Sequence, residues 1–155
     1  MTTGISDEAG IKASYQGEAV AGEYVARRFA SELYRLLHER QVAAVQRVID
    51  RVQPGYILEI APGPGRLTRD LRPTGTLVCL EYNEGMIAQG RAAAGWAAWV
   101  RGDGFRLPFD QIFDLVYTFR FVRHFRRSDR ERLYVQVRRV LKPGGYFVLD
   151  AVNER

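Results

Sequence analysis

The chain contains very little cysteine, which limits the chemistry it can carry. Cys79 is the one cysteine among 155 residues, so an internal disulfide and a four-cysteine zinc site are both excluded. It lies within the apolar run 77–80, where we expect a small buried hydrophobic side chain rather than a nucleophile. A reducing, cytoplasmic setting fits so little cysteine. We identify no set of metal ligands in the sequence.

Long hydrophobic runs are also lacking. No apolar run approaches the roughly 18 residues that a membrane-spanning helix needs, and residues 1–10 have neither the basic start nor the apolar stretch of a signal peptide. Hydrophobic residues make up 46% of the chain and charged residues 26%, which excludes a disordered or coiled-coil protein. We therefore expect a flexible N-terminus over residues 1–13, then a single domain over residues 14–155 with no membrane contact.

The positive charge is concentrated in one segment. The formal net charge is +5, but residues 120–139 contain eight arginines and only two acidic residues, whereas the rest of the chain is close to neutral. A solvated helix face accounts for most of these arginines. One short basic segment gives only a small positively charged surface for RNA, so a nucleic acid is not the partner we expect.

Short apolar runs alternate with helical patterns over most of the chain. Apolar residues spaced three or four apart predict two helices, over residues 17–37 and 38–52, which form an N-terminal cap. Five apolar runs follow, at residues 56–60, 77–80, 97–100, 113–117 and 146–149, with helical patterns between them at 67–71, 84–94 and 129–141. This order predicts the α/β class, a Rossmann-like, doubly wound parallel sheet with helices on both faces.

Two local signals fix the last helix. Ser128 and Glu131 have the S-x-x-E spacing of a capping box at its start. The sequence Lys-Pro-Gly-Gly at 142–145 predicts that the helix ends there and that the chain turns into the fifth strand.

The most informative segment is a Gly/Pro loop between the first predicted strand and the next helix. In a sheet of this kind, ligands bind beyond the carboxyl ends of the strands, and Gly63 and Gly65 would let a ligand approach the backbone there. Glu81 follows the second run, 18 residues past Gly63, where a carboxylate can accept hydrogen bonds from both hydroxyls of a ribose. Asp103 follows the third run. Together these residues predict a nucleoside site, although a tight turn without a ligand would also explain the glycines.

The loop does not fit the common phosphate-binding patterns. A dinucleotide motif would need glycine at Thr68, and no G-K-[ST] phosphate loop is present. Glu59, just before the loop, suits a cofactor that carries an amino group and would repel a pyrophosphate.

Five stretches taken in order resemble the class I S-adenosylmethionine-dependent methyltransferases, in particular their broad small-molecule group. They are residues 59–65 (EIAPGPG), 81–86 (EYNEGM), 107–109 (LPF), 113–116 (FDLV) and 141–145 (LKPGG). The resemblance covers about residues 40–151. It implies the strand order 3-2-1-4-5, S-adenosylmethionine as the cofactor, and methyl transfer to a small-molecule acceptor.

The resemblance also assigns the methionine end of the cofactor. The loop containing Ala61, Gly63 and Gly65 would lie against the methionine part, with Glu59 near its amino group. Thr118, after the fourth strand, would face the methionine and the acceptor. Glycine is usual in the family where Ala61 stands here, so the loop would sit slightly further from the ligand.

For the adenosine end, the resemblance implies that Glu81 holds the ribose hydroxyls. Tyr82 and Met86 would pack on the adenine, Asp103 would accept from the adenine amino group, and Gly104 would supply backbone beside it.

The acceptor is harder to assign, because methyl transfer chiefly requires alignment and exclusion of water, and a base is optional. On that side we expect Arg120, which could pair with an anionic acceptor, and His124. Tyr24 is a third candidate, from the N-terminal cap.

Two other functions stay open. A cofactor-binding but inactive subunit or scaffold would conserve the same loops. An RNA methyltransferase is the weaker alternative: residues 58–68 resemble the ribosomal RNA adenine dimethyltransferases, but residues 118–121 lack the Asn/Asp-Pro-Pro-aromatic motif of enzymes that methylate base amino groups.

The resemblance implies a further helix and an antiparallel hairpin after the fifth strand, and neither fits into the residues after 151. We therefore expect the domain to lack its usual C-terminal hairpin. Three explanations stay open: a fragment of a longer protein, a natural minimal domain, or an uncovered fifth-strand edge that is completed by a second copy of the chain or by a partner.

Overall fold

The computed structural model describes residues 32–150. The sheet has five strands, all parallel, in the order β3-β2-β1-β4-β5, which confirms the predicted fold class and strand order. The expected flexible start, the first residues of the helical cap and Tyr24 lie outside the described residues. The strands are β1 (Tyr56–Ile60), β2 (Thr76–Glu81), β3 (Ala98–Arg101), β4 (Phe113–Thr118) and β5 (Leu141–Leu149).

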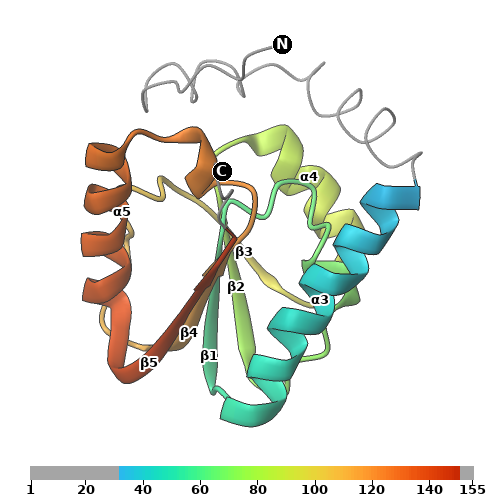
Figure 1. Ribbon diagram of the computed structural model, residues 1–155, viewed down its shortest axis with the longest axis horizontal. Helices are drawn as coiled ribbons and strands as arrows, with labels where there is room; N and C mark the ends of the chain where they lie inside the picture. The colour runs from blue at the N-terminus through green and yellow to red at the C-terminus, as the bar shows by residue number, and fades with distance from the viewer. Residues whose placement is uncertain (1–31, 151–155) are drawn as a thin grey trace.

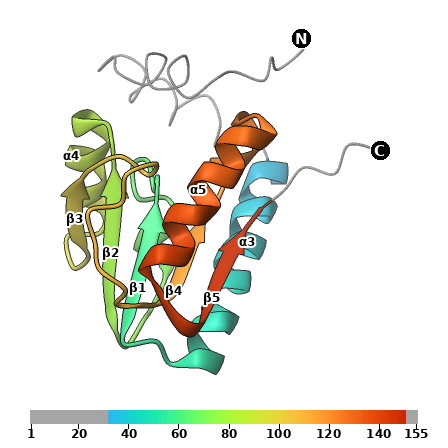
Figure 2. The same ribbon diagram turned by 90° about the vertical axis from the view of Figure 1, so that its left-hand side faces the viewer.

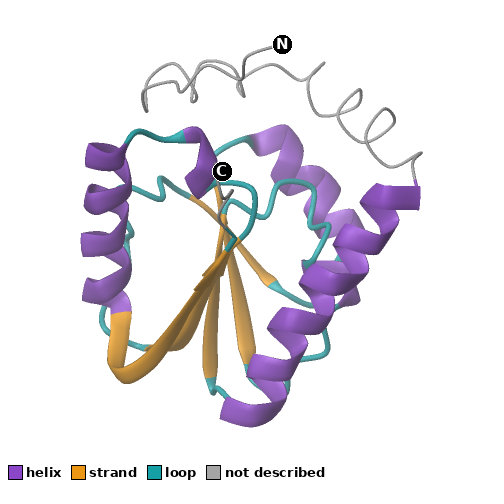
Figure 3. Ribbon diagram, viewed as in Figure 1, coloured by secondary structure: helices purple, strands orange, loops and turns teal. Residues whose placement is uncertain are grey.

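Helices cover both faces of this sheet, so the domain has three layers (Figure 3). Helices α3 (Glu32–Val52) and α4 (Glu84–Ala93) lie on one face, and α5 (Arg127–Val140) lies on the other (Figures 1 and 2). Because successive strand residues point to opposite faces, each strand contributes to two separate cores. On one side Val45 and Ile49 of α3 pack with Ile57 and Tyr117, and on the other Leu133 and Val137 of α5 pack with Leu58 and Val116.

Two helix predictions were wrong in extent. Helix α3 runs through the expected break at residue 38, because no glycine or proline interrupts it before Pro54. The helix expected at residues 67–71 is a single 3₁₀ turn, η1 (Thr68–Asp70). Pro73 follows closely and disfavours helical backbone at the residue before it, so the turn cannot extend.

The predicted capping box is also absent. Helix α5 begins at Arg127, one residue before Ser128, and its N-cap Arg126 makes no side-chain capping bond. The Glu131 carboxylate instead accepts a hydrogen bond from Nε of Arg127, one turn earlier, at 3.0 Å.

The turn expected at residues 142–145 lies within β5. Helix α5 ends at Val140, just before this segment, and the chain turns there into the strand as predicted (Figure 1). Strand pairing with β4 jumps from Phe113–Leu141 to Leu115–Tyr146, so the Lys-Pro-Gly-Gly segment also forms a bulge in the ladder. Gly144 has a φ of +78°, a conformation that suits glycine.

Since all strands run in one direction, the loops after β1, β2, β3 and β4 gather at one edge of the sheet. A short 3₁₀ turn, η2 (Val122–His124), belongs to the loop after β4. The candidate ligand residues therefore come from segments far apart in the sequence.

Candidate functional site

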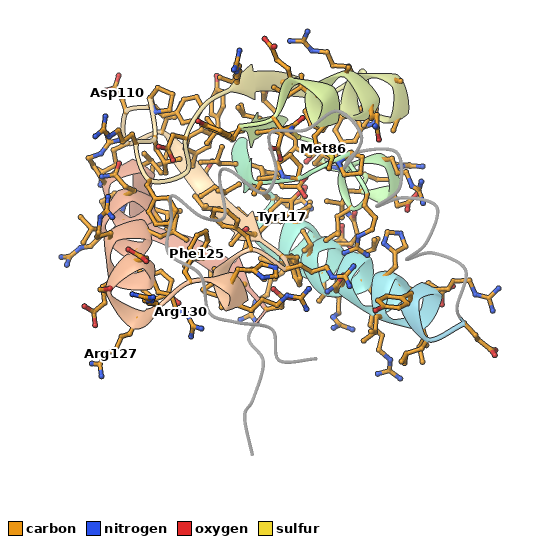
Figure 4. The ribbon with its side chains drawn as sticks, turned by 90° about the horizontal axis from the view of Figure 1, so that it is seen from above. Met86, Asp110, Tyr117, Phe125, Arg127 and Arg130 are labelled. Atoms are coloured by element: carbon orange, nitrogen blue, oxygen red, sulfur yellow. The ribbon has the colours of Figure 1, made fainter. Side chains whose placement is uncertain are left out.

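A cleft opens over the carboxyl ends of β1 to β4. Eight of the ten predicted cofactor residues line it, as do the predicted acceptor-side residues Arg120 and His124. The eight are Glu59, Ala61, Gly63, Glu81, Tyr82, Met86, Asp103 and Gly104. Sequence reasoning thus brought together residues from four loops, and Met86 points inward from α4 (Figure 4).

Glu81 joins the loop after β1 to the loop after β2. Its Oε2 accepts a hydrogen bond from the backbone N–H of Gly63 at 3.0 Å, while Oε1 accepts from those of Tyr82 at 2.8 Å and Asn83 at 2.9 Å. Burial raises the pKa of this carboxyl, and the three N–H donors oppose that effect. The carboxylate is therefore already fixed at the cleft wall before any ligand arrives.

Glu59 is the second buried carboxyl of the cleft. Its Oε2 accepts hydrogen bonds from Oγ1 of Thr68 at 2.6 Å and from the Tyr117 hydroxyl at 2.8 Å. Burial raises the pKa of Glu59 to about 7, although both hydroxyls and the positive charge of Arg66 act in the opposite direction. Near neutral pH the group is therefore poised between its charged and neutral forms.

The loop after β3 is shaped by Asp103. Its Oδ1 accepts from the backbone N–H of Phe105 at 2.9 Å, which fixes the turn. A Cβ on Gly104 would stand 3.0 Å from a methyl group of Ile60, so glycine lets this loop approach the end of β1.

Two predicted residues do not line the cleft. Gly65 packs against α4 and β3, where a Cβ would lie 3.2 Å from the Trp99 ring and 3.3 Å from the backbone of Gly90. Thr118 is fully buried, and its hydroxyl donates to the carbonyl oxygen of Ile60 at 2.8 Å, which ties β4 to β1. The expectation that Thr118 faces the ligand was wrong, because this neighbouring strand takes its hydroxyl.

Sequence reasoning missed Arg66 and an aromatic wall. Arg66 is nearly buried, and its guanidinium donates to Nδ1 of His38 at 2.9 Å and to Oε1 of Gln41 at 2.5 Å. Because arginine can only donate, Nδ1 of His38 accepts, and Nε2 faces the Asp70 carboxylate at 2.6 Å. The wall consists of Phe105, Phe119, Phe121 and Phe125. The alternating aromatics of residues 119–125 were the signal for it.

Cys79 is fully buried, as predicted, and burial raises the pKa of its thiol well above the usual range. This confirms a packing role and argues against a nucleophile. Among residues 32–150 no cluster of three or more potential metal ligands is present, and no helix is long and apolar enough to cross a membrane.

Ala61 adopts a left-handed backbone conformation, with a φ of +55°. Since a Cβ is unfavourable there, Ala61→Gly is expected to raise the free energy of unfolding by about 1 kcal/mol, measured by urea denaturation. The matched control is Ala92→Gly on the exposed face of α4. This substitution should lower the free energy of unfolding by up to about 1 kcal/mol. A loss of stability in Ala61→Gly would contradict the interpretation that the backbone of Ala61 is strained.

Glu59→Gln should change the pH dependence of stability. The folded pKa of about 7 lies above the ordinary value of 4.5, so the folded state holds the extra proton between these pH values. Stability from this group therefore falls as pH rises from about 4.5 to 7. Glutamine still accepts from both hydroxyls, and the variant should be about 3 kcal/mol more stable than the wild type at pH 8, with little difference at pH 4.5. Equal differences at both pH values, in denaturant titrations, would refute the raised pKa.

Comparison with known proteins agrees with this geometry. The sequence profile of the methyltransferase domain family matches residues 58–149. The ubiquinone/menaquinone biosynthesis C-methyltransferase UbiE of Ectopseudomonas mendocina is 38% identical over 109 residues, which cover 61% of this chain and 41% of that protein. The sterol 24-C-methyltransferase ERG6B of Gibberella zeae is 34% identical over 106 residues, which cover 62% of this chain and 27% of that protein. The chain thus spans less than half the length of these relatives.

Solved structures show the same fold. The DhpI-SAM-HEP complex superposes with a TM-score of 0.69 at 26% identity, covering 94% of this chain and 66% of that one. Magnesium protoporphyrin IX methyltransferase (ChlM) from Synechocystis, solved with bound SAM, superposes with a TM-score of 0.71 at 14% identity. The match covers 91% of this chain and 74% of that one, and it supports the fold alone. With its matched profile, strand order and cleft, the chain belongs to the methyltransferase domain family.

Proposed function

We propose that the protein binds S-adenosylmethionine in this cleft and transfers its methyl group to a small-molecule acceptor. The observation that carries the proposal is the buried Glu81 carboxylate, which is fixed at the cleft wall by three backbone N–H groups. A carboxylate has about four acceptor positions, so it can still receive a ribose hydroxyl. The DhpI-SAM-HEP complex, at 26% identity, supports the choice of cofactor.

We assign the two ends of the cofactor to the two ends of the cleft. At the adenosine end, Glu81 holds the ribose, Asp103 accepts from the adenine amino group beside Gly104, and Tyr82 and Met86 pack on the ring. The methionine part lies against the loop of Ala61 and Gly63, with Glu59 near the amino group. That cation favours the charged form of Glu59. Gly65 and Thr118 act indirectly, through packing of the loop and of the strand end.

The cofactor supplies a methyl group made electrophilic by a sulfonium. The chain's own residues orient the acceptor and exclude water, and the Phe wall contributes to the apolar enclosure. Arg120 and His124 contact the acceptor, and His124 accepts a proton where the nucleophile arrives protonated. From the sequence we also propose that Tyr24 contacts the acceptor. We also propose a cytoplasmic setting, supported by the single, buried cysteine.

Removal of the Glu81 charge tests cofactor binding. Glu81→Gln should weaken binding of S-adenosylhomocysteine by about 10- to 100-fold in calorimetry, since hydrogen bonds to charged groups contribute about 1.5–3 kcal/mol. Glu84→Gln removes the same charge from a side chain that is 74% exposed on α4, and should bind normally. Thermal unfolding of both variants shows whether the loops stay folded.

A wild-type protein that prefers NAD, or a Glu81→Gln variant that binds with unchanged affinity, would overturn the cofactor assignment. Binding alone does not separate an active enzyme from the inactive scaffold. Methyl transfer to an acceptor does so, because the scaffold predicts binding without turnover.

We further propose that β5 pairs with a second copy of the chain. In the described sheet, β5 pairs only with β4, and Tyr146 is 47% exposed. Light scattering at micromolar concentration should give a dimer, and Tyr146→Lys should give a monomer, because charge on an edge strand opposes pairing. A monomeric wild type would refute the dimer.

A further inference from the structure

Arg120 holds a backbone conformation that rarely suits a large side chain. Its φ is +62°, in the left-handed region that favours glycine. The conformation is held by Asp150, whose Oδ1 accepts the backbone N–H of Arg120 at 2.6 Å. Strained residues of this kind gather at functional sites, where the surrounding structure enforces them. The strain therefore directs attention to what the Arg120 side chain does.

The side chain of Arg120 is held by helix α3. Arg120 is one of the residues that line the cleft, and its Cζ lies 5.4 Å from the centre of the Tyr34 ring on α3, in cation–π range. Gln41, also on α3, donates to the other Asp150 oxygen at 3.5 Å. Helix α3 thus supports both the side chain and the backbone of Arg120. Among residues 32–150 no carboxylate lies within ion-pair distance of its guanidinium.

The surroundings of Arg120 are aromatic. Phe119 and Phe121, its two neighbours in sequence, line the cleft with Phe125, and the rings of Phe121 and Phe125 pack edge to face at 4.7 Å. Flat apolar groups pack well on such surfaces. In this part of the wall the positively charged Arg120 therefore has aromatic side chains as its neighbours.

The charge balance of the cleft favours a singly charged ligand group. Carboxylates of Glu59, Glu81 and Asp103 line the same cleft, and one guanidinium offsets a single negative charge. Arg66, the other guanidinium of the lining, is hydrogen-bonded to α3. A planar carboxylate matches the two parallel N–H groups of an arginine, whereas a phosphate dianion would meet more repulsion.

Building on the proposed function, we propose that the acceptor is a carboxylic acid with a flat, ring-bearing body, and that Arg120 selects it by binding the carboxylate. The carboxylate is the group by which the acceptor is held, and the rings lie against Phe119, Phe121 and Phe125. Tyr34 and Asp150 are positioning residues that act through Arg120.

The test compares two probes of equal shape, 2-naphthoate and 2-naphthamide, by calorimetry on protein saturated with S-adenosylhomocysteine. The wild type should bind naphthoate about tenfold more tightly, because a charged hydrogen bond is lost with the amide. Arg120→Ala and Arg120→Gly should abolish this preference and leave the affinity for S-adenosylhomocysteine unchanged. Arg127→Ala, a matched loss of charge at a side chain that is 94% exposed and points away from the domain, should keep the preference (Figure 4).

The two Arg120 variants also separate function from strain. Both lose the guanidinium, but only alanine keeps a Cβ at positive φ, so Arg120→Gly should melt at a higher temperature than Arg120→Ala. The reverse order would overturn the strain argument.

A wild type without preference for naphthoate, or a preference that persists in both Arg120 variants, would overturn the proposed acceptor class. A wild type that fails to bind S-adenosylhomocysteine would instead overturn the proposed function. The naphthoate comparison can then be run on the protein alone, so the two failures remain distinguishable.

Discussion

The site depends on one buried carboxylate, that of Glu81. Removal of a carboxylate from water is unfavourable, and here three backbone N–H groups offset part of that penalty. Because those groups belong to two different loops, the same bonds that stabilise the charge also hold the loop after β1 against the end of β2. The cleft is therefore organised before a ligand binds, which reduces the entropy that binding must lose.

Other parts of the cleft wall lower the stability of the fold. Ala61 and Arg120 both adopt left-handed backbone conformations that glycine would adopt without strain, and Glu59 is buried with its pKa near neutrality. Such features are expected where function, and not stability, determines the residue. The rest of the domain offsets them with two apolar cores on either side of a parallel sheet.

The sequence was most informative where local pattern and topology coincide. Short apolar runs indicated the strands, and parallel order then placed the residues after each strand at one edge, which is why Glu81 and Asp103 were found. Features set by distant partners were not predictable. Arg66 depends on His38 and Gln41, more than 20 residues away, and Thr118 is turned inward by a carbonyl of β1. The bulge within β5 was likewise not predictable, because it depends on the register with β4.

A crystal structure with S-adenosylhomocysteine tests the central claim most directly. The account predicts that a ribose hydroxyl donates to the remaining acceptor position of the Glu81 carboxylate, with the adenine between Tyr82 and the Asp103 loop. An empty cleft at saturating ligand, or a ribose that contacts another part of the protein, would contradict it.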